Sequence, residues 1–155
     1  MQEVALTKEM KELLRHDLCS RLPYGVKAQF WGEEEEQFCY DTVDSVFISG
    51  ESDEVLIGQY AVGIGDIKPY LFPMSGMTEE QKQEFISVAG YERREEDCGR
   101  HSETYYYDMV GHERNFYPNI DAIDWLNKNH FDYRGLIEKG LAIDATGLGI
   151  YQCVY

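Results

Sequence analysis

One stretch near the end of the chain gathers side chains of the kinds that active sites use: residues 124–140 read DWLNKNHFDYRGLIEKG. His130 lies between two carboxylate residues of this stretch, Asp124 and Asp132. A histidine that a carboxylate orients can act as a general base, because its ordinary pKa lies close to neutrality. Such chemistry also requires a nucleophile or an activated water, and the sequence contains no motif that supplies either. A small enzyme that uses these three residues is therefore one hypothesis for the chain.

The same stretch also has a purely structural explanation, which we favour. The spacing of apolar residues predicts a helix over residues 120–128 with Trp125 in the core. Asp132 can then cap a second short helix that ends near Lys139, and Gly140 suits the left-handed position that follows a helix. Each of these residues thus has a local role in two helices and the corner between them, without any catalysis.

Negative charge is the strongest global feature of the sequence. The chain has 155 residues, of which 29 are Asp or Glu and 14 are Lys or Arg, so its formal net charge is -15. Ten of the acids fall between Lys27 and Lys68, where there is no Lys or Arg, which leaves 19 acids against the 14 bases elsewhere. The ten are Glu33, Glu34, Glu35, Glu36, Asp41, Asp44, Glu51, Asp53, Glu54 and Asp66. This segment therefore carries two thirds of the net charge.

This charge distribution disfavours some partners and favours others. Nucleic-acid backbones and anionic membranes are bound through clustered Lys and Arg, so direct binding of either is disfavoured. A basic protein surface is the complementary partner, for example the nucleic-acid site of another protein, and the nine acids from Glu33 to Glu54 are the candidate partner-binding residues. Duplex DNA presents about one charge per 1.7 Å of axis, so an imitation of it needs many carboxylates on one face. The alternative is that the acids only keep the protein soluble.

Short motifs for cofactors and metals are weak in this sequence. The GIG at 63–65 and the GLG at 147–149 lack the third glycine of a dinucleotide-binding loop, and there is no GxxxxGK[ST] pattern. Cys98, His101 and His112 could chelate a metal in principle, but their spacing matches no familiar site. We therefore expect neither a cofactor nor a metal ion.

Cysteine spacing and hydropathy indicate a reduced, cytoplasmic protein. The four cysteines are Cys19, Cys39, Cys98 and Cys153, and they are too far apart for the dense disulfide framework of a small secreted domain. No apolar run reaches the roughly eighteen residues of a membrane helix, and the first residues lack the layout of a signal peptide.

Hydrophobic periodicity predicts the elements that must position these groups. Thr7 is the expected cap of a helix over residues 8–21, and Thr78 with Gln81 forms a capping-box pattern before a helix over residues 79–89. Three β-rich runs lie between the two helices, at residues 26–31, 37–48 and 54–62. Short polar turns separate these runs, as in an antiparallel meander.

Together these elements predict one α+β domain over residues 1–155. It should contain an antiparallel sheet, an N-terminal helix and two or three helices in the second half. Residues 91–117 are the least regular part, and we expect them to form a β-hairpin or an excursion that contacts a partner. The sequence leaves the oligomeric state open between a monomer and a two-fold homodimer.

Three stretches of the chain resemble a known group of sequences. They are MKELLRHDLCSRLPYGVK at 10–27, IKPYLFPMSGMTEEQ at 67–81 and WLNKNHFDYRGLIEKGLAID at 125–144. Together they resemble a family of small uncharacterised proteins that gut bacteria, their prophages and other mobile elements encode. The resemblance implies no catalytic residue. It implies an intracellular bacterial or phage setting, and it favours an accessory protein that binds host factors.

Overall fold

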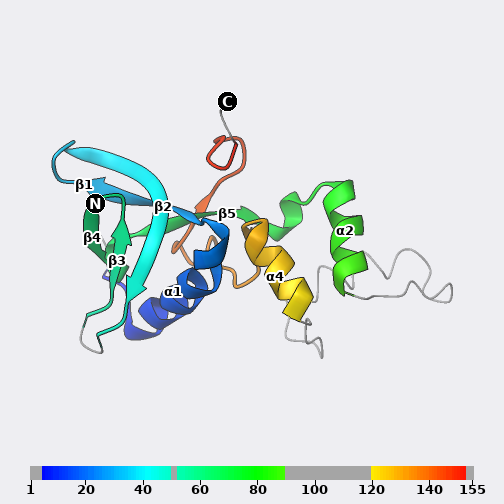
Figure 1. Cartoon of the computed structure of the whole chain (residues 1–155), viewed down its shortest axis with the longest axis horizontal. Coiled ribbons are helices and arrows are strands. Elements are labelled where there is room, and N and C mark those ends of the chain that lie inside the picture. The colour runs from blue at the N-terminus through cyan, green and yellow to red at the C-terminus, as the bar shows by residue number, and fades with distance from the viewer. Residues whose placement is uncertain (1–4, 50–51, 90–119, 153–155) are drawn as a thin grey trace.

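The computed structural model of the chain describes residues 5–49, 52–89 and 120–152 (Figure 1). Its first element is helix α1, Lys8–Arg21. The Thr7 side-chain oxygen accepts a hydrogen bond from the Met10 N–H at 3.2 Å, which confirms the predicted cap. Leu14 and Leu18 are fully buried in the main core, and α1 lies beneath the sheet in Figure 1.

Four antiparallel strands form a meander after α1. They are β1 (Lys27–Gly32), β2 (Gln37–Phe47), β3 (Glu54–Ile57) and β4 (Tyr60–Gly63). The predicted run at 54–62 is a hairpin rather than one strand, because the chain turns at Gly58, whose φ is +58°. β1 pairs with the first half of β2 and β3 with its second half, and the register shifts between Val43 and Ser45.

Three further strands extend this sheet beyond β1. They are β5 (Lys68–Pro73), β6 (Phe131–Asp132) and β7 (Ile143–Asp144). The strand order is β4-β3-β2-β1-β5-β6, and β7 also pairs with β5. β5 is antiparallel to β1, whereas β6 and β7 are parallel to β5. The predicted α+β domain is therefore confirmed, with two short parallel additions that the sequence did not indicate.

Two helices of the second half of the fold pack on each other beside β6. They are α2 (Glu79–Ala89) and α4 (Ile120–Lys128), and they form a second apolar cluster at the right of Figure 1. The Thr78 N–H donates to Gln81 Oε1 at 2.9 Å and the Gln81 N–H donates to Thr78 Oγ1 at 3.1 Å, which confirms the capping box. Phe85 of α2 meets Trp125 of α4 with ring centroids 5.4 Å apart.

The second short helix predicted over 132–139 is wrong. Residues 133–140 form turns instead. The reason lies at Gly135, whose φ of +71° places left-handed backbone inside the predicted helix. Asp132 itself is extended and pairs with β5, a conformation that suits a capping residue.

Asp132 nevertheless caps the backbone that follows it. Its two carboxylate oxygens accept hydrogen bonds from the Leu136 N–H at 2.8 Å and the Ile137 N–H at 2.9 Å. Gly140 has φ +72°, and the Leu141 N–H donates to the Leu136 carbonyl at 2.9 Å. The left-handed stop predicted at Gly140 is therefore confirmed even though the helix before it is absent.

Parts of the expected structure fall outside the described residues. The predicted hairpin or excursion at 91–117 and the side chain of Glu51 both do so. Within the described ranges, none of the helices combines the length and apolar character needed to cross a membrane.

Candidate functional site

His130 is held at the corner after α4 as a largely buried ring. Its φ is +61°, which is uncommon for a residue with a side chain. The imidazole stacks on the Tyr151 ring, with 3.6 Å between centroids and 10° between planes. Burial lowers the pKa of His130 from 6.5 to about 4, and the charges of Arg21 and Lys27 add to this effect. The ring is therefore uncharged at neutral pH, and its buried Nδ1 has no hydrogen-bond partner within the described ranges.

The two aspartates of the catalytic hypothesis contact other groups. The carboxylate of Asp132 is 7% exposed and is occupied by the backbone N–H groups described above. Asp124 is exposed on α4 and hydrogen-bonds to Tyr24, whose pKa is raised by desolvation and by this carboxylate. The hydrogen bonds of both aspartates are thus with groups other than His130, and an oriented general base is not assembled there.

A buried ion cluster beside His130 escaped the sequence reasoning. Asp17 and Arg21, one helical turn apart on α1, form a bidentate pair at 2.9 and 3.1 Å, and both side chains are fully buried. Arg134 Nη1 donates to the same carboxylate at 2.9 Å, and Arg21 Nη2 donates to the Phe131 carbonyl at 2.7 Å. The i, i+4 spacing of Asp17 and Arg21 was a usable signal, but their distant partners gave none. The cluster ties α1 to β6 and acts as a structural anchor.

The predicted acidic residues form two groups at opposite ends of β2. The first group, in the turn between β1 and β2, consists of Glu33, Glu34, Glu35 and Glu36. The second, at the start of β3, consists of Asp53 and Glu54. Asp41 and Asp44 lie between the groups on β2, whose eleven residues span about 35 Å. The structure therefore does not gather these carboxylates into one cluster.

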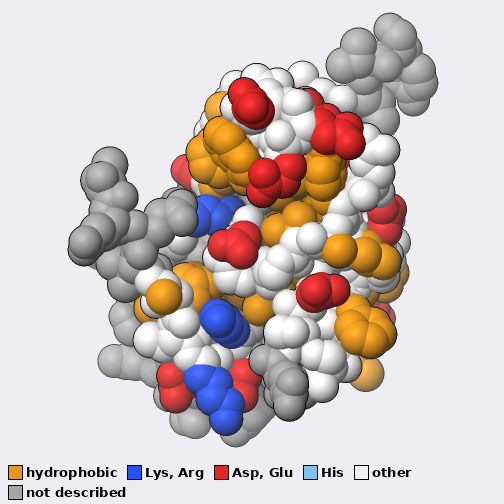
Figure 2. Space-filling view, turned by 90° about the vertical axis from the view of Figure 1, so that its left-hand side faces the viewer, with side chains coloured by type: hydrophobic (Ala, Val, Ile, Leu, Met, Phe, Trp, Pro, Cys, Tyr) orange, Lys and Arg blue, Asp and Glu red, His pale blue; other side chains and the backbone are white. Residues whose placement is uncertain are grey.

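The two groups also differ in how far cations neutralise them. Asp53 forms an ion pair with Arg15 of α1 at 3.2 Å. In the part of the chain that the structure describes, no Lys or Arg forms an ion pair with the turn acids at 33–36, with Asp41 or with Asp44. Figure 2 shows carboxylates interleaved with hydrophobic side chains over the upper part of this side of the molecule, with Lys and Arg lower down. The negative potential of the turn therefore remains uncompensated.

Exposed aromatic residues on β1 and β2 also escaped the sequence reasoning. Trp31, Phe38 and Tyr40 are 44%, 60% and 53% exposed, and the strand register puts them on the face opposite the buried Phe30. Trp31 and Phe38 are cross-strand neighbours whose rings meet edge to face at 5.2 Å. We call these three residues, together with Glu33, Glu34 and Glu36, the ribbon face. Exposed aromatic clusters of this kind are typical of interaction sites.

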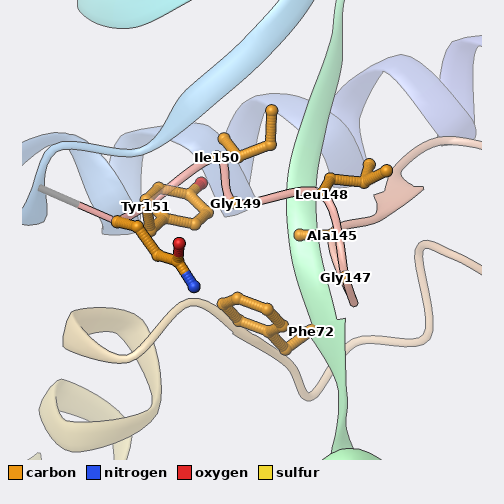
Figure 3. Close-up of a pocket in the computed structure, with 8 residues that line it drawn as sticks. Phe72, Ala145, Gly147, Leu148, Gly149, Ile150 and Tyr151 are labelled. Atoms are coloured by element: carbon orange, nitrogen blue, oxygen red, sulfur yellow. The ribbon is translucent and has the colours of Figure 1, made fainter. Parts of the chain in front are cut away.

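A shallow pocket of about 370 Å³ lies elsewhere, under the C-terminal segment (Figure 3). Phe72 of β5 forms one wall, and Tyr151 and Leu148 lie across from it. Tyr151 is the one titratable residue of the lining, and its hydroxyl is already hydrogen-bonded to the backbone of Tyr70 and Lys27.

Metal ligands do not cluster within residues 5–49, 52–89 and 120–152, where no three His, Cys, Asp or Glu side chains are placed to hold an ion. Cys98, His101 and His112 lie outside these ranges. Comparisons with protein-family models, with curated proteins and with solved structures found no match to the chain.

Proposed function

We propose that the protein is a non-catalytic binding module whose ribbon face docks on a basic surface of another protein. One combination supports this: large exposed aromatic side chains beside carboxylates that no described Lys or Arg neutralises. Buried aromatic residues carry much of the binding energy of protein interfaces, and complementary charge steers the partners together. The resemblance to proteins of gut bacteria and prophages supports a host protein, such as one that binds nucleic acid, as the partner.

The size of the ribbon face favours a local basic patch over a long DNA-binding channel. The six paired residues of β1 span about 20 Å, a length over which duplex DNA presents about twelve charges. The ribbon-face carboxylates, which are Glu33, Glu34 and Glu36, supply about a quarter of that number. Affinity must therefore also come from Trp31, Phe38 and Tyr40.

A reducing cytoplasmic compartment belongs to the same proposal. Cys19 is an exposed free thiol on α1, and Cys39 is a half-buried free thiol on β2. Free thiols of this kind persist where the surroundings are reducing, which supports an intracellular setting.

Salt-dependent retention of a basic protein tests the proposal. The immobilised chain is expected to retain DNA-binding proteins from a bacterial extract at about 50 mM salt and to release them at about 500 mM, because screening weakens exposed charge pairs. The triple variant Glu33→Gln/Glu34→Gln/Glu36→Gln and the single variant Phe38→Ser should each lose this retention.

A matched charge control makes the result specific. The triple variant Glu80→Gln/Glu84→Gln/Glu138→Gln removes the same charge from exposed positions outside the ribbon face and should retain the proteins as wild type does. If the control variant loses as much retention as the ribbon-face variants, the acids act through net charge alone and the docking proposal is wrong. The proposal is also wrong if the ribbon-face variants retain the proteins as wild type does.

A further inference from the structure

One edge of β2 has no neighbour over the first half of the strand. β1 pairs along one edge with residues 37–42, whereas β3 pairs along the other edge only from Val43 to Phe47. The edge of residues 37–42 that faces away from β1 therefore has no strand beside it in the described part of the fold. Figure 1 shows this half of β2 curving away from β3 and β4 at the upper left.

The backbone of Phe38 and Tyr40 supplies the hydrogen-bonding groups of this free edge. The Thr42 N–H donates to the Asp41 side chain at 2.7 Å. The Thr42 N–H therefore points away from β1. Antiparallel ladders alternate, so that every second residue directs its N–H and C=O to the same edge. Phe38 and Tyr40 share this alternation with Thr42, and among the described residues no backbone group pairs with theirs on this edge, so an added strand could do so.

The two sides of the free edge have opposite chemistry. On the outer side, the rings of Phe38 and Tyr40 are more than half exposed. On the inner side, the Glu35 carboxylate folds under the ribbon, where it accepts a hydrogen bond from the Tyr60 hydroxyl at 2.8 Å. Asp41 lies on the same inner side, because it pairs with the buried Ala28. An added strand would thus meet aromatic rings on one face and carboxylates on the other.

We propose that the partner binds this edge as an extended segment in which basic residues alternate with apolar ones. Its basic side chains would face Glu35 and Asp41, its apolar side chains would cover Phe38 and Tyr40, and its backbone would pair with β2. Strand addition of this kind takes its affinity from main-chain hydrogen bonds and its specificity from alternate side chains. The inference rests on the proposed docking function and extends it: the docked segment would contact Glu35 and Asp41, on the inner side of the edge, in addition to the ribbon face.

Two capped peptides of equal composition test the alternation. The first is Lys-Val-Lys-Val-Lys-Val-Lys, and the second is the block order Lys-Lys-Lys-Lys-Val-Val-Val. Titration followed by amide NMR should give the alternating peptide a Kd lower by about tenfold, a factor that corresponds to about 1.4 kcal/mol. The amides of Phe38 and Tyr40 should exchange with deuterium more slowly in that complex. Equal affinities without this protection would show that charge alone attracts the peptides, which overturns the strand inference but leaves the docking function standing.

Two substitutions at one position test the backbone contribution. Tyr40→Ala removes the ring and keeps the N–H, whereas Tyr40→Pro removes both and spares the hydrogen bonds to β1, because the Tyr40 N–H faces the free edge. Tyr40→Pro should weaken binding of the alternating peptide by about tenfold beyond Tyr40→Ala, with circular dichroism confirming that both variants fold. Equal binding by the two variants, or no binding of either peptide to wild type, overturns the inference. A free chain that already dimerises through this edge, seen as slow exchange at Tyr40 and a doubled mass, also overturns it.

Discussion

The fold uses His130 for packing, although its residue type could do chemistry. Its backbone carbonyl accepts a hydrogen bond from the Phe72 N–H at 2.8 Å, and its ring stacks on Tyr151. The left-handed backbone at this position lets the chain leave α4 and enter β6 within three residues. Protonation would create a cation close to Arg21 and Lys27, both of which already lower the pKa of the ring. Acid should therefore destabilise this corner.

The variant His130→Asn tests this linkage, because asparagine tolerates left-handed backbone and does not titrate. The pKa of His130 is about 4 in the folded chain and 6.5 as the ordinary value, so the unfolded chain takes up a proton between these pH values while the folded chain does not. The contribution of His130 to the free energy of unfolding is fully present above pH 6.5 and is lost as the pH falls toward 4. Urea unfolding at pH 7 and at pH 4.5 should show wild type losing about 2 kcal/mol more than the variant, a value reduced for solvent screening of a partly exposed ring. Equal losses would mean that His130 is not the group responsible.

At the scale of elements, Tyr151 fastens the C-terminal segment to the sheet. Its hydroxyl donates to the Tyr70 carbonyl at 2.6 Å and accepts from the Lys27 N–H at 3.0 Å. Its ring also meets Phe72, with centroids 5.9 Å apart. Burial raises the pKa of Tyr151 from 10.0 to about 12, so the protonated hydroxyl is the form that the fold stabilises.

Tyr151→Phe should therefore destabilise the chain by about 1–3 kcal/mol at pH 7, because the Lys27 N–H loses its acceptor. Between pH 10 and 12 the unfolded wild type releases a proton that the folded chain keeps, so its stability should fall as the pH rises through this window. Tyr151→Phe should not show this loss of stability at alkaline pH. Tyr40→Phe is the control, since the Tyr40 ring is exposed and should tolerate the change within about 0.5 kcal/mol. Equal effects of the two substitutions in chemical denaturation would contradict the anchoring role of Tyr151.

Elements that depend on neighbours along the chain could be predicted from the sequence. Thr7 caps α1 by contact with the third residue after it, and Thr78 and Gln81 cap each other across the same spacing. The hairpin at Gly58 was missed because an apolar run does not reveal a left-handed residue within it. The helix predicted after Asp132 was wrong because Gly135 adopts left-handed backbone within it, which the spacing of apolar residues does not reveal.

Only part of the candidate site could be predicted for the same reason. The acids were identified from composition, but strand register separates them into two groups at opposite ends of β2. The alternation of side chains along β1 and β2 indicates two faces of the sheet, but it does not show which face packs on the core. Trp31, Phe38 and Tyr40 therefore could not be assigned to the surface. Arg21 reaches the Phe131 carbonyl across 110 residues, a contact that no local pattern indicates.

At the scale of the whole molecule, negative charge is concentrated where it should oppose folding. Four consecutive glutamates form the turn at 33–36, and Glu36 also has φ +51°, a conformation that residues with side chains adopt at a cost. Like charges in a turn repel each other at low salt, and no described Lys or Arg forms an ion pair with them. Natural sequences often retain such unfavourable features at binding surfaces, where function and stability conflict.

Neutralising the turn should consequently stabilise the free protein while abolishing docking. We expect Glu33→Gln/Glu34→Gln/Glu36→Gln to raise the Tm by about 2–4 °C at low salt, an increase that should vanish near 1 M salt, where the Debye length is about 3 Å. The control Glu80→Gln/Glu84→Gln/Glu138→Gln should leave the Tm unchanged or lower it, because Glu80 lies in the first turn of α2 and favours that helix end. Thermal unfolding followed by circular dichroism at both salt concentrations measures the difference. If both triple variants raise the Tm equally, charge repulsion is spread over the whole surface. The turn at 33–36 would then not be a site that is retained at the expense of stability.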